Sequence, residues 1–260
     1  MDANSLFSVD GKVAVVTGGS RGIGLMIAEG LVRAGATVYI SSRKAAVCDE
    51  VAAQLSEFGT CVSIPADLST LDGVRGLAAA VASSTPQVDI LVNNAGATWG
   101  APLREFPDDA WDKVLATNVK AVFNLTTALM PQLLVSASPD DPSRVINIGS
   151  VDGIRVPETE NYAYAASKAA VHMVTRQLAH RVSRDHITVN AIAPGPFPSK
   201  MMAFVLDAEC GEELVSSGIP LGRIGRPEDV AGTVIYLSSR AGSYLTGVII
   251  PVDGGLSTHG

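Results

Sequence analysis

The sequence has 260 residues, of which 47% are hydrophobic and 17% are charged, and its net charge is −7 at pH 7. This composition argues against a disordered chain, because it supplies ample apolar side chains for a large core. The negative charge argues against binding to nucleic acid or to an anionic membrane, since both require a clustered basic surface. The length suits one large α/β domain.

The first ten residues lack the basic and apolar stretches of a signal peptide, and no apolar run approaches the roughly 18 residues of a membrane span. Cys48, Cys61 and Cys210 are widely separated, and we expect them to be reduced, buried thiols. Neither they nor the histidines, such as His172, have zinc-ligand spacing. We therefore expect a soluble, cytoplasmic protein without a metal site.

Seven short apolar runs rich in β-branched residues recur along the chain, at 12–18, 37–42, 61–66, 89–94, 144–149, 187–192 and 247–252. Such runs are typical of strands buried on both faces. Segments with helical periodicity lie between them, the first at about 22–34. This alternation predicts a doubly wound (Rossmann) α/β fold, with a seven-stranded parallel sheet and helices on both faces, in a single domain spanning 1–260.

The segment 196–220 departs from this alternation. It follows a strand end, begins with prolines and carries an apolar face made of Phe197, Met201, Met202, Phe204 and Val205. Ligands of a doubly wound sheet bind beyond the carboxyl ends of its strands, so this segment is predicted to be a substrate lid. The alternative is an amphipathic helix packed on the core.

A glycine-rich turn, T-G-G-S-R-G-I-G at 17–24, joins the first strand to the first helix. Its glycines leave the backbone unobstructed, so that a pyrophosphate can reach the free N–H groups of the helix N-terminus. The sequence therefore predicts a dinucleotide site here.

The end of the second strand indicates which dinucleotide binds. Sites that prefer NAD place a carboxylate there for the ribose hydroxyl, but this strand ends in Ser41, Ser42 and Arg43. Arg21 in the glycine turn offers a second guanidinium, and the two arginines can bind a 2′-phosphate. NADP(H) is therefore predicted over NAD(H), the alternative being that both arginines are solvated surface charges.

Tyr164 and Lys168 stand four residues apart in Y-A-A-S-K, which places a phenol and an ammonium on one face of a helix. A nearby cation favours the phenolate, so Tyr164 is predicted to exchange protons near neutral pH. Tyr162 has Ala166 at the corresponding position and cannot form such a pair.

Together these motifs resemble the short-chain dehydrogenase/reductase family along the whole chain. The resemblance rests on the glycine turn, D-L at 67–68, N-N-A-G at 93–96, A-T-N-V around 118, N-I-G-S ending at 150, P-G-P-F-P-S at 194–199 and P-V-D-G-G at 251–255. It implies a catalytic tetrad of Asn118, Ser150, Tyr164 and Lys168. Tyr164 would protonate a carbonyl oxygen that Ser150 holds, while Lys168 would lower the phenol pKa and bind the nicotinamide ribose, and Asn118 would hold a water of a proton relay.

The same resemblance implies a cofactor site formed by Gly18, Ser20, Arg21, Gly22, Ile23, Gly24, Ser42, Arg43, Asp67, Leu68, Asn94, Ala95, Gly96, Tyr164, Lys168, Pro194, Gly195, Phe197 and Ser199. Phe197 and Ser199 depart from the family pattern, which more often has an aliphatic residue and a threonine. Asp152, just after the predicted catalytic serine, has no assigned role.

Within the family, the amino-terminal and central segments are most similar to an NADPH-dependent β-ketoacyl reductase. This similarity suggests a 3-oxoacyl thioester or a related ketone as substrate, and the family resemblance implies a homotetramer. A steroid, terpenoid or aromatic ketone fits the apolar lid equally well. The rival functions are an NAD(P)-linked dehydrogenase that oxidises a secondary alcohol and a non-catalytic NADP-binding regulator.

Overall fold

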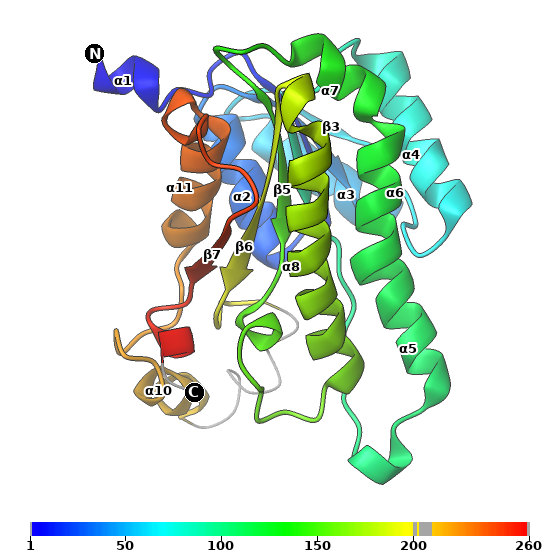
Figure 1. Cartoon of the computed structure of the whole chain (residues 1–260), viewed down its shortest axis with the longest axis vertical. Coiled ribbons are helices and arrows are strands. Elements are labelled where there is room, and N and C mark those ends of the chain that lie inside the picture. Colours follow the sequence, from blue (N-terminus) through cyan, green and yellow to red (C-terminus); the bar gives the residue numbers. More distant parts are fainter. Residues whose placement is uncertain (1, 200–201, 203–209, 259–260) are drawn as a thin grey trace.

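The computed structural model describes residues 2–199, 202 and 210–258. Seven parallel strands form one sheet in the order β3-β2-β1-β4-β5-β6-β7 (Figure 1). They are β1 (Val13–Thr17), β2 (Thr37–Ser41), β3 (Cys61–Ser63), β4 (Ile90–Asn93), β5 (Ser143–Ile148), β6 (Ile187–Pro194) and β7 (Ile249–Val252). Each predicted run overlaps one of these strands, and the predicted single doubly wound domain is confirmed.

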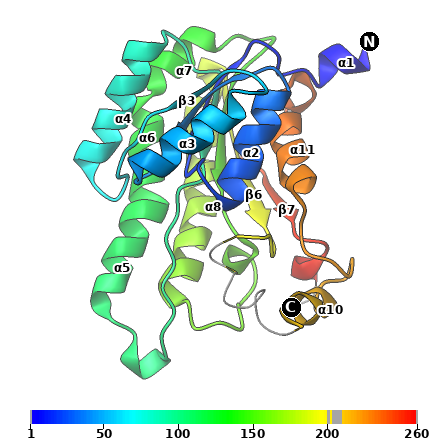
Figure 2. The same ribbon diagram turned by 180° about the vertical axis from the view of Figure 1, so that it is seen from behind.

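Helices cover both faces of the sheet. One face carries α2 (Gly22–Arg33), α3 (Ala45–Leu55) and α11 (Pro227–Ser238), which lie in front in Figure 2. The other carries α4 (Leu71–Ser84), α6 (Ala121–Ala128) and α8 (Tyr162–Val182). The other α-helices in the described part of the chain are α1 (Ala3–Leu6), α5 (Asp108–Leu115), α7 (Met130–Ser136) and α10 (Gly211–Ser217).

Within the described residues, the short helical turns are five 3₁₀ turns and one π-helical turn. The 3₁₀ turns are η1 (Leu103–Glu105), η3 (Val151–Gly153), η4 (Ser183–Asp185), η5 (Arg240–Gly242) and η6 (Leu256–Thr258). The π-helical turn η2 (Ala116–Lys120) joins α5 to α6.

The central strands explain why ligands are expected at one end of the sheet. The chain runs outward from β1 through β2 to β3 and then crosses to β4 on the other side of β1, where Val16 pairs with Val92. The carboxyl ends of β1 and β4 therefore lie side by side at the point where the winding reverses. A doubly wound sheet binds its ligands at this switch point.

Two predictions need correction in detail. The strand expected at 61–66 has only three residues, because β3 lies at the sheet edge and Pro65 cannot donate to a ladder. Cys48 and Cys61 are buried as expected, but Cys210 is exposed, because it precedes the short surface helix α10.

No helix within the described ranges is long and apolar enough to cross a membrane.

Candidate active site

The glycine turn after β1 presents free backbone N–H groups. Gly18 and Gly22 have φ of 67° and 52°, in the left-handed region that favours glycine. The helix α2 starts at Gly22, and no described side chain caps its N-terminus. These N–H groups are therefore available to an anion such as a pyrophosphate.

The Asn94 side chain holds this turn in place from β4. Its Nδ2 donates to the carbonyl oxygens of Thr17 at 2.9 Å and Gly18 at 3.3 Å. The Thr17 hydroxyl in turn accepts from the backbone N–H groups of Asn94 at 2.9 Å and Ala95 at 3.0 Å. The amide of Asn94 thus supports the turn, and Thr17 is a supporting residue that the sequence prediction omitted. Its signal is a hydroxyl that closes an otherwise apolar strand.

The end of β2 suits a phosphate. The Ser42 hydroxyl is buried and has no hydrogen-bond partner within the part of the chain that the structure describes. Arg43 is exposed beside it, and so is Arg21 in the glycine turn. Hydrogen bonds from Ser69 and, to a smaller extent, the charge of Arg43 lower the pKa of Asp67, so Arg43 and Asp67 lie on the same side of the site. An unpaired hydroxyl next to the exposed Arg43 fits the extra phosphate of NADP(H).

Two predicted cofactor residues point their side chains into the core. Leu68 packs between α4 and the sheet, and Phe197 is only 2% exposed. A methyl group added at Gly225 would overlap the Phe197 ring, so the missing side chain of Gly225 makes room for this ring. Only the backbone atoms of these two residues are therefore available to contact a cofactor. Phe197, predicted on the apolar face of a lid, packs with the core cluster that contains Ile192 and Val230.

The start of the predicted lid lies next to the glycine turn. A methyl group added at Gly22 would lie 3.2 Å from the Ser199 Cβ. Pro194 ends β6, and Gly195 packs against Asp253, in the segment that follows β7. Of the predicted apolar face, Met201, Phe204 and Val205 fall outside the described residues.

The other predicted cofactor residues follow the same two strand ends. Ser20 is buried in the glycine turn, Ile23 and Gly24 lie in the first turn of α2, and Ala95 and Gly96 directly follow β4.

Tyr164, Lys168 and Ser150 come together at the carboxyl ends of β5 and β6. The Lys168 Nζ lies 5.4 Å from the centre of the Tyr164 ring and donates to the Ile148 carbonyl at 2.7 Å. Ser150 follows β5, and its hydroxyl hydrogen-bonds the Tyr164 side chain. A carbonyl oxygen placed at this pair would meet two hydroxyl groups.

Asn118 lies in the π-helical turn η2, a distortion that is frequent at functional sites. Its Nδ2 donates to the Ala97 carbonyl and to the Ser167 hydroxyl, both at 2.9 Å, and its Oδ1 accepts from the Ala97 N–H at 2.8 Å. Both amide hydrogens are therefore used, and one acceptor position on Oδ1 remains. A methyl group added at Gly96 would lie 3.5 Å from this oxygen and 3.8 Å from the Lys168 Nζ, so the two groups face one space.

The pKa of the Tyr164 phenol differs from the prediction. Burial and, to a smaller extent, the charge of Asp152 raise this pKa to about 12, although the Ser150 hydrogen bond opposes them. Burial also lowers the pKa of Lys168 to about 8, against the opposing effect of Asp152. The expected lowering of the phenol pKa by Lys168 is thus not found, because desolvation of the phenolate dominates.

Asp152 is held at this site by two hydrogen bonds. Its backbone N–H donates to the Ser150 hydroxyl at 3.1 Å, and its Oδ2 accepts from the Asn161 amide at 3.0 Å. Its carboxylate therefore lies on the loop between the predicted catalytic serine and tyrosine.

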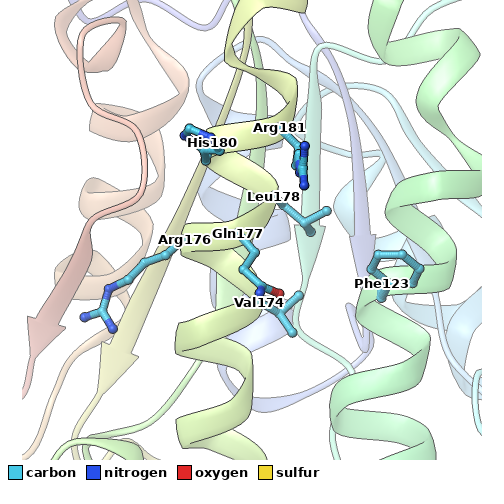
Figure 3. Close-up of a pocket in the computed structure, with 7 residues that line it drawn as sticks. All are labelled: Phe123, Val174, Arg176, Gln177, Leu178, His180 and Arg181. Carbon is cyan, nitrogen blue, oxygen red and sulfur yellow. The ribbon is translucent and has the colours of Figure 1, made fainter.

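A cavity of about 540 Å³ opens elsewhere, on the outer side of α6 and α8 (Figure 3). Its lining residues are Phe123, Val174, Arg176, Gln177, Leu178, His180 and Arg181. The tetrad residues on α8 precede this stretch by more than one turn. Among the described residues, no group of acidic, histidine and cysteine side chains could hold a metal ion.

Comparison with known proteins gives relatives along the whole chain. The family model described as Enoyl-(Acyl carrier protein) reductase matches residues 18–257. The chain is 50% identical over 249 residues to the Rhamnolipids biosynthesis 3-oxoacyl-[acyl-carrier-protein] reductase of Pseudomonas aeruginosa, covering 96% of this chain and 97% of that protein. It is 35% identical over 258 residues to Gluconate 5-dehydrogenase of Gluconobacter oxydans, covering 99% of each.

A solved structure agrees with these relatives. The Pseudomonas aeruginosa RhlG/NADP active-site complex superposes with a TM-score of 0.95 at 49% identity, covering 97% of this chain and 99% of that one.

Proposed function

This chain belongs to the short-chain dehydrogenase/reductase family, and from that premise we propose that it reduces a ketone to an alcohol with NADPH. The proposed substrate class is a 3-oxoacyl thioester. The convergence of Tyr164, Ser150 and Lys168 beside a phosphate-binding glycine turn carries this proposal. The 50% identity to a 3-oxoacyl reductase of rhamnolipid biosynthesis supports the choice of substrate class.

When bound, NADPH supplies the hydride. Tyr164 gives its hydroxyl proton to the carbonyl oxygen, and the Ser150 hydroxyl hydrogen-bonds the same oxygen. A pKa of about 12 keeps the phenol protonated at neutral pH, so Tyr164 is ready to act as an acid. This protonation state favours reduction over the rival oxidation of an alcohol, which would need the phenolate as base.

The proton lost from Tyr164 is replaced through Lys168 and Asn118. We propose that a water occupies the space near Gly96 that the Lys168 Nζ and the free acceptor position of Asn118 both face. The Lys168 ammonium would then have two functions, since it would also bind the nicotinamide ribose.

The surroundings of the site support an apolar substrate. Ile154 and Val156 are exposed on the loop between Ser150 and Tyr164, with Val156 89% exposed, and Leu214 is exposed on α10 at the same end of the molecule (Figure 1). We propose that the segment 196–220 closes over an acyl chain together with these side chains.

The direct test is NADPH oxidation with 3-oxoacyl thioesters of several chain lengths, simple ketones and 5-ketogluconate. We expect an optimum among the 3-oxoacyl thioesters. Preference for the sugar acid would contradict the substrate class and would agree with the similarity to gluconate 5-dehydrogenase.

Removal of the Tyr164 hydroxyl tests the proposed acid. We expect Tyr164→Phe to lower kcat by at least about 100-fold, the usual contribution of a positioned acid, while NADPH still binds. Tyr162→Phe is the matched control, because Tyr162 lies two residues away on the same helix and bonds Glu160 instead. Undiminished turnover in Tyr164→Phe would refute this role, and a wild-type protein that binds NADPH but reduces nothing would favour the regulator.

Cofactor preference tests the phosphate site. We expect kcat/KM to be higher with NADPH than with NADH, because Ser42, Arg43 and Arg21 can bind the 2′-phosphate and no carboxylate ends β2. Steady-state rates with both cofactors measure this. Equal or better use of NADH would contradict the assignment.

We further infer a homotetramer in the cytoplasm. Phe123 and Met173 are exposed on the outer side of α6 and α8, beside the cavity of Figure 3, and an apolar surface of this kind supports assembly. Cys48, Cys61 and Cys210 form no disulfide within the described structure, which supports a reducing compartment.

A further inference from the structure

A histidine with no part in the proposed proton transfer is buried against the segment that carries Ser150. His172 lies one helical turn after Lys168 on α8 and is 5% exposed. Its Nε2 has no hydrogen-bond partner in the part of the chain that the structure covers. A buried polar atom without a partner costs about 1–3 kcal/mol, so an apolar residue would be more stable here unless the ring has another role.

The imidazole occupies the space beside two glycines that bracket the catalytic serine. A methyl group added at Gly149 would overlap the His172 Nε2, and one added at Gly153 would lie 2.9 Å from its Cε1. Ser150 lies between these contacts. The ring thus fills the space that a side chain at 149 would need, and at 153 it shares that space with the backbone of Lys168 and Ala169.

Two further hydrogen bonds fix the start of the same turn. Lys168 donates to the Ile148 carbonyl, and the Gly149 N–H donates to the Ile192 carbonyl, both at 2.7 Å. The turn also meets α8 at Gly153, where an added methyl group would lie 2.7 Å from the backbone of Lys168 and Ala169, and through the Ser150 hydroxyl, which hydrogen-bonds the Tyr164 side chain. His172 adds the contact at Gly149, the residue directly before Ser150.

His172 is uncharged at neutral pH. Burial and the charges of Lys168 and Arg176 lower its pKa to about 4, although a hydrogen bond with the Gly153 backbone opposes this. Asp152 on the turn is the acidic group of this cluster and acts on Lys168. A neutral ring is suited to this place, since a second cation beside Lys168 would be repelled.

We propose that His172 is a positioning residue of this enzyme, whose neutral imidazole spaces the 149–153 turn from α8 and so places the Ser150 hydroxyl against Tyr164 and the substrate carbonyl. This inference rests on the proposed function, because it assumes that Ser150 binds a reacting carbonyl.

The first test replaces the ring with a side chain of similar size that lacks its nitrogens and its planar shape. We expect His172→Leu to lower kcat about 10- to 100-fold, as small misplacements of reacting groups do, while the Kd for NADPH stays within about twofold. Val182→Ala is the control for lost packing, because Val182 is buried on the same helix far from the turn. It should lower Tm and leave kcat unchanged. A kcat for His172→Leu within about twofold of wild type would overturn the proposal.

A double-mutant cycle separates positioning from general stability. If His172 acts through Ser150, then His172→Leu should lower kcat little further in an enzyme that already carries Ser150→Ala. A further loss of about tenfold in that background would overturn the proposal, because the two effects would then be independent.

A second variant pair decides the question if His172→Leu does not fold. Gly149→Ala creates the overlap with the imidazole, and we expect it to lower kcat about tenfold or more. Adding His172→Ala removes the ring and should restore part of that loss. The proposal would be contradicted if Gly149→Ala kept the wild-type kcat, or if the double variant recovered none of the lost kcat. The contact between residue 149 and His172 would then not determine the position of the turn.

Failure of the proposed function can be told apart from failure of this inference. A wild-type enzyme that reduces no ketone with NADPH would refute the function before any variant is made. Amide hydrogen exchange in 149–153 tests His172 without turnover. Faster exchange there in His172→Leu than in Val182→Ala supports the proposal, and equal exchange overturns it.

Discussion

Asp152 is the residue whose charge acts on both members of the catalytic pair. It raises the pKa of Tyr164 and of Lys168, while burial pushes these two pKa values in opposite directions. For the phenol the two effects add, and for the ammonium they oppose each other. The carboxylate therefore helps to keep both groups protonated, which is the state that ketone reduction requires.

Removing this charge should move the pH dependence of the reaction. Lys168 has a pKa of about 8, so its ammonium is present below that pH and is lost as the pH rises through it. Asp152→Asn removes a charge that raises this pKa, so we expect the alkaline fall of kcat/KM to begin at lower pH than in wild type. The Asn161 hydrogen bond can persist, because an asparagine oxygen also accepts.

A pH–rate profile measures this shift. Asp140→Asn is the control, because Asp140 is exposed on the loop before β5. An alkaline limb at unchanged or higher pH in Asp152→Asn would contradict the assigned effect.

For single residues, the position of Tyr164 and Lys168 on one face of a helix could be predicted, because a regular helix fixes which side chains share a face. The pKa of Tyr164 could not, since it depends on how deeply the fold buries the phenol. The direction of the Phe197 side chain could not be predicted for a related reason. It depends on the space left by Gly225, which is remote in sequence.

Among the elements, the π-helical turn η2 has the most direct link to the site. The extra residue that it accommodates lets Asn118 bond the backbone of Ala97 in both directions. The segment after β4, which carries Ala95 and Gly96, is thereby tied to the start of α6. Asn118 was predicted as a water ligand, and the structure adds this bracing contact.

Truncation of this side chain should therefore affect stability as well as binding. Asn118→Ala removes the partner of the partly buried N–H and carbonyl of Ala97 and of the buried Ser167 hydroxyl, so we expect the free energy of unfolding to fall by about 1–3 kcal/mol and NADPH to bind more weakly. Urea unfolding and a cofactor titration measure the two effects. Asn124→Ala, at a partly exposed position of α6, should change neither. An unaltered unfolding free energy in Asn118→Ala would show that the bracing contacts contribute little.

For the whole molecule, assembly is the property that can be tested with a single charge. Phe123 is 49% exposed on α6, next to the cavity of Figure 3. A lysine buried in an interface beside Arg176 and Arg181 is costly, so Phe123→Lys should shift the protein from the proposed tetramer to smaller species in light scattering. Phe58→Lys is the matched control, because Phe58 is 48% exposed and lies near the sheet edge, away from this cavity. A wild-type monomer, or an intact Phe123→Lys tetramer, would contradict this interface.

The overall architecture could be predicted almost completely from sequence. Seven β-branched runs separated by helical segments permit few arrangements other than a doubly wound parallel sheet, and the observed strand order follows that pattern. The polar side chains that hold the site in place could not be predicted. Examples are Asn94, which contacts the glycine turn, and His172, which contacts the 149–153 turn. They join segments whose separation in sequence carries no periodic signal.

The closeness of Gly22 and Ser199 has a kinetic consequence. The segment that follows β6 reaches the glycine turn at Ser199, so we expect NADPH bound at that turn to lie under the start of this segment and to complete the surface that a ketone meets near Tyr164. We therefore expect an ordered sequence in which NADPH binds first and NADP⁺ leaves last. Added NADP⁺ would then compete with NADPH and not with the ketone.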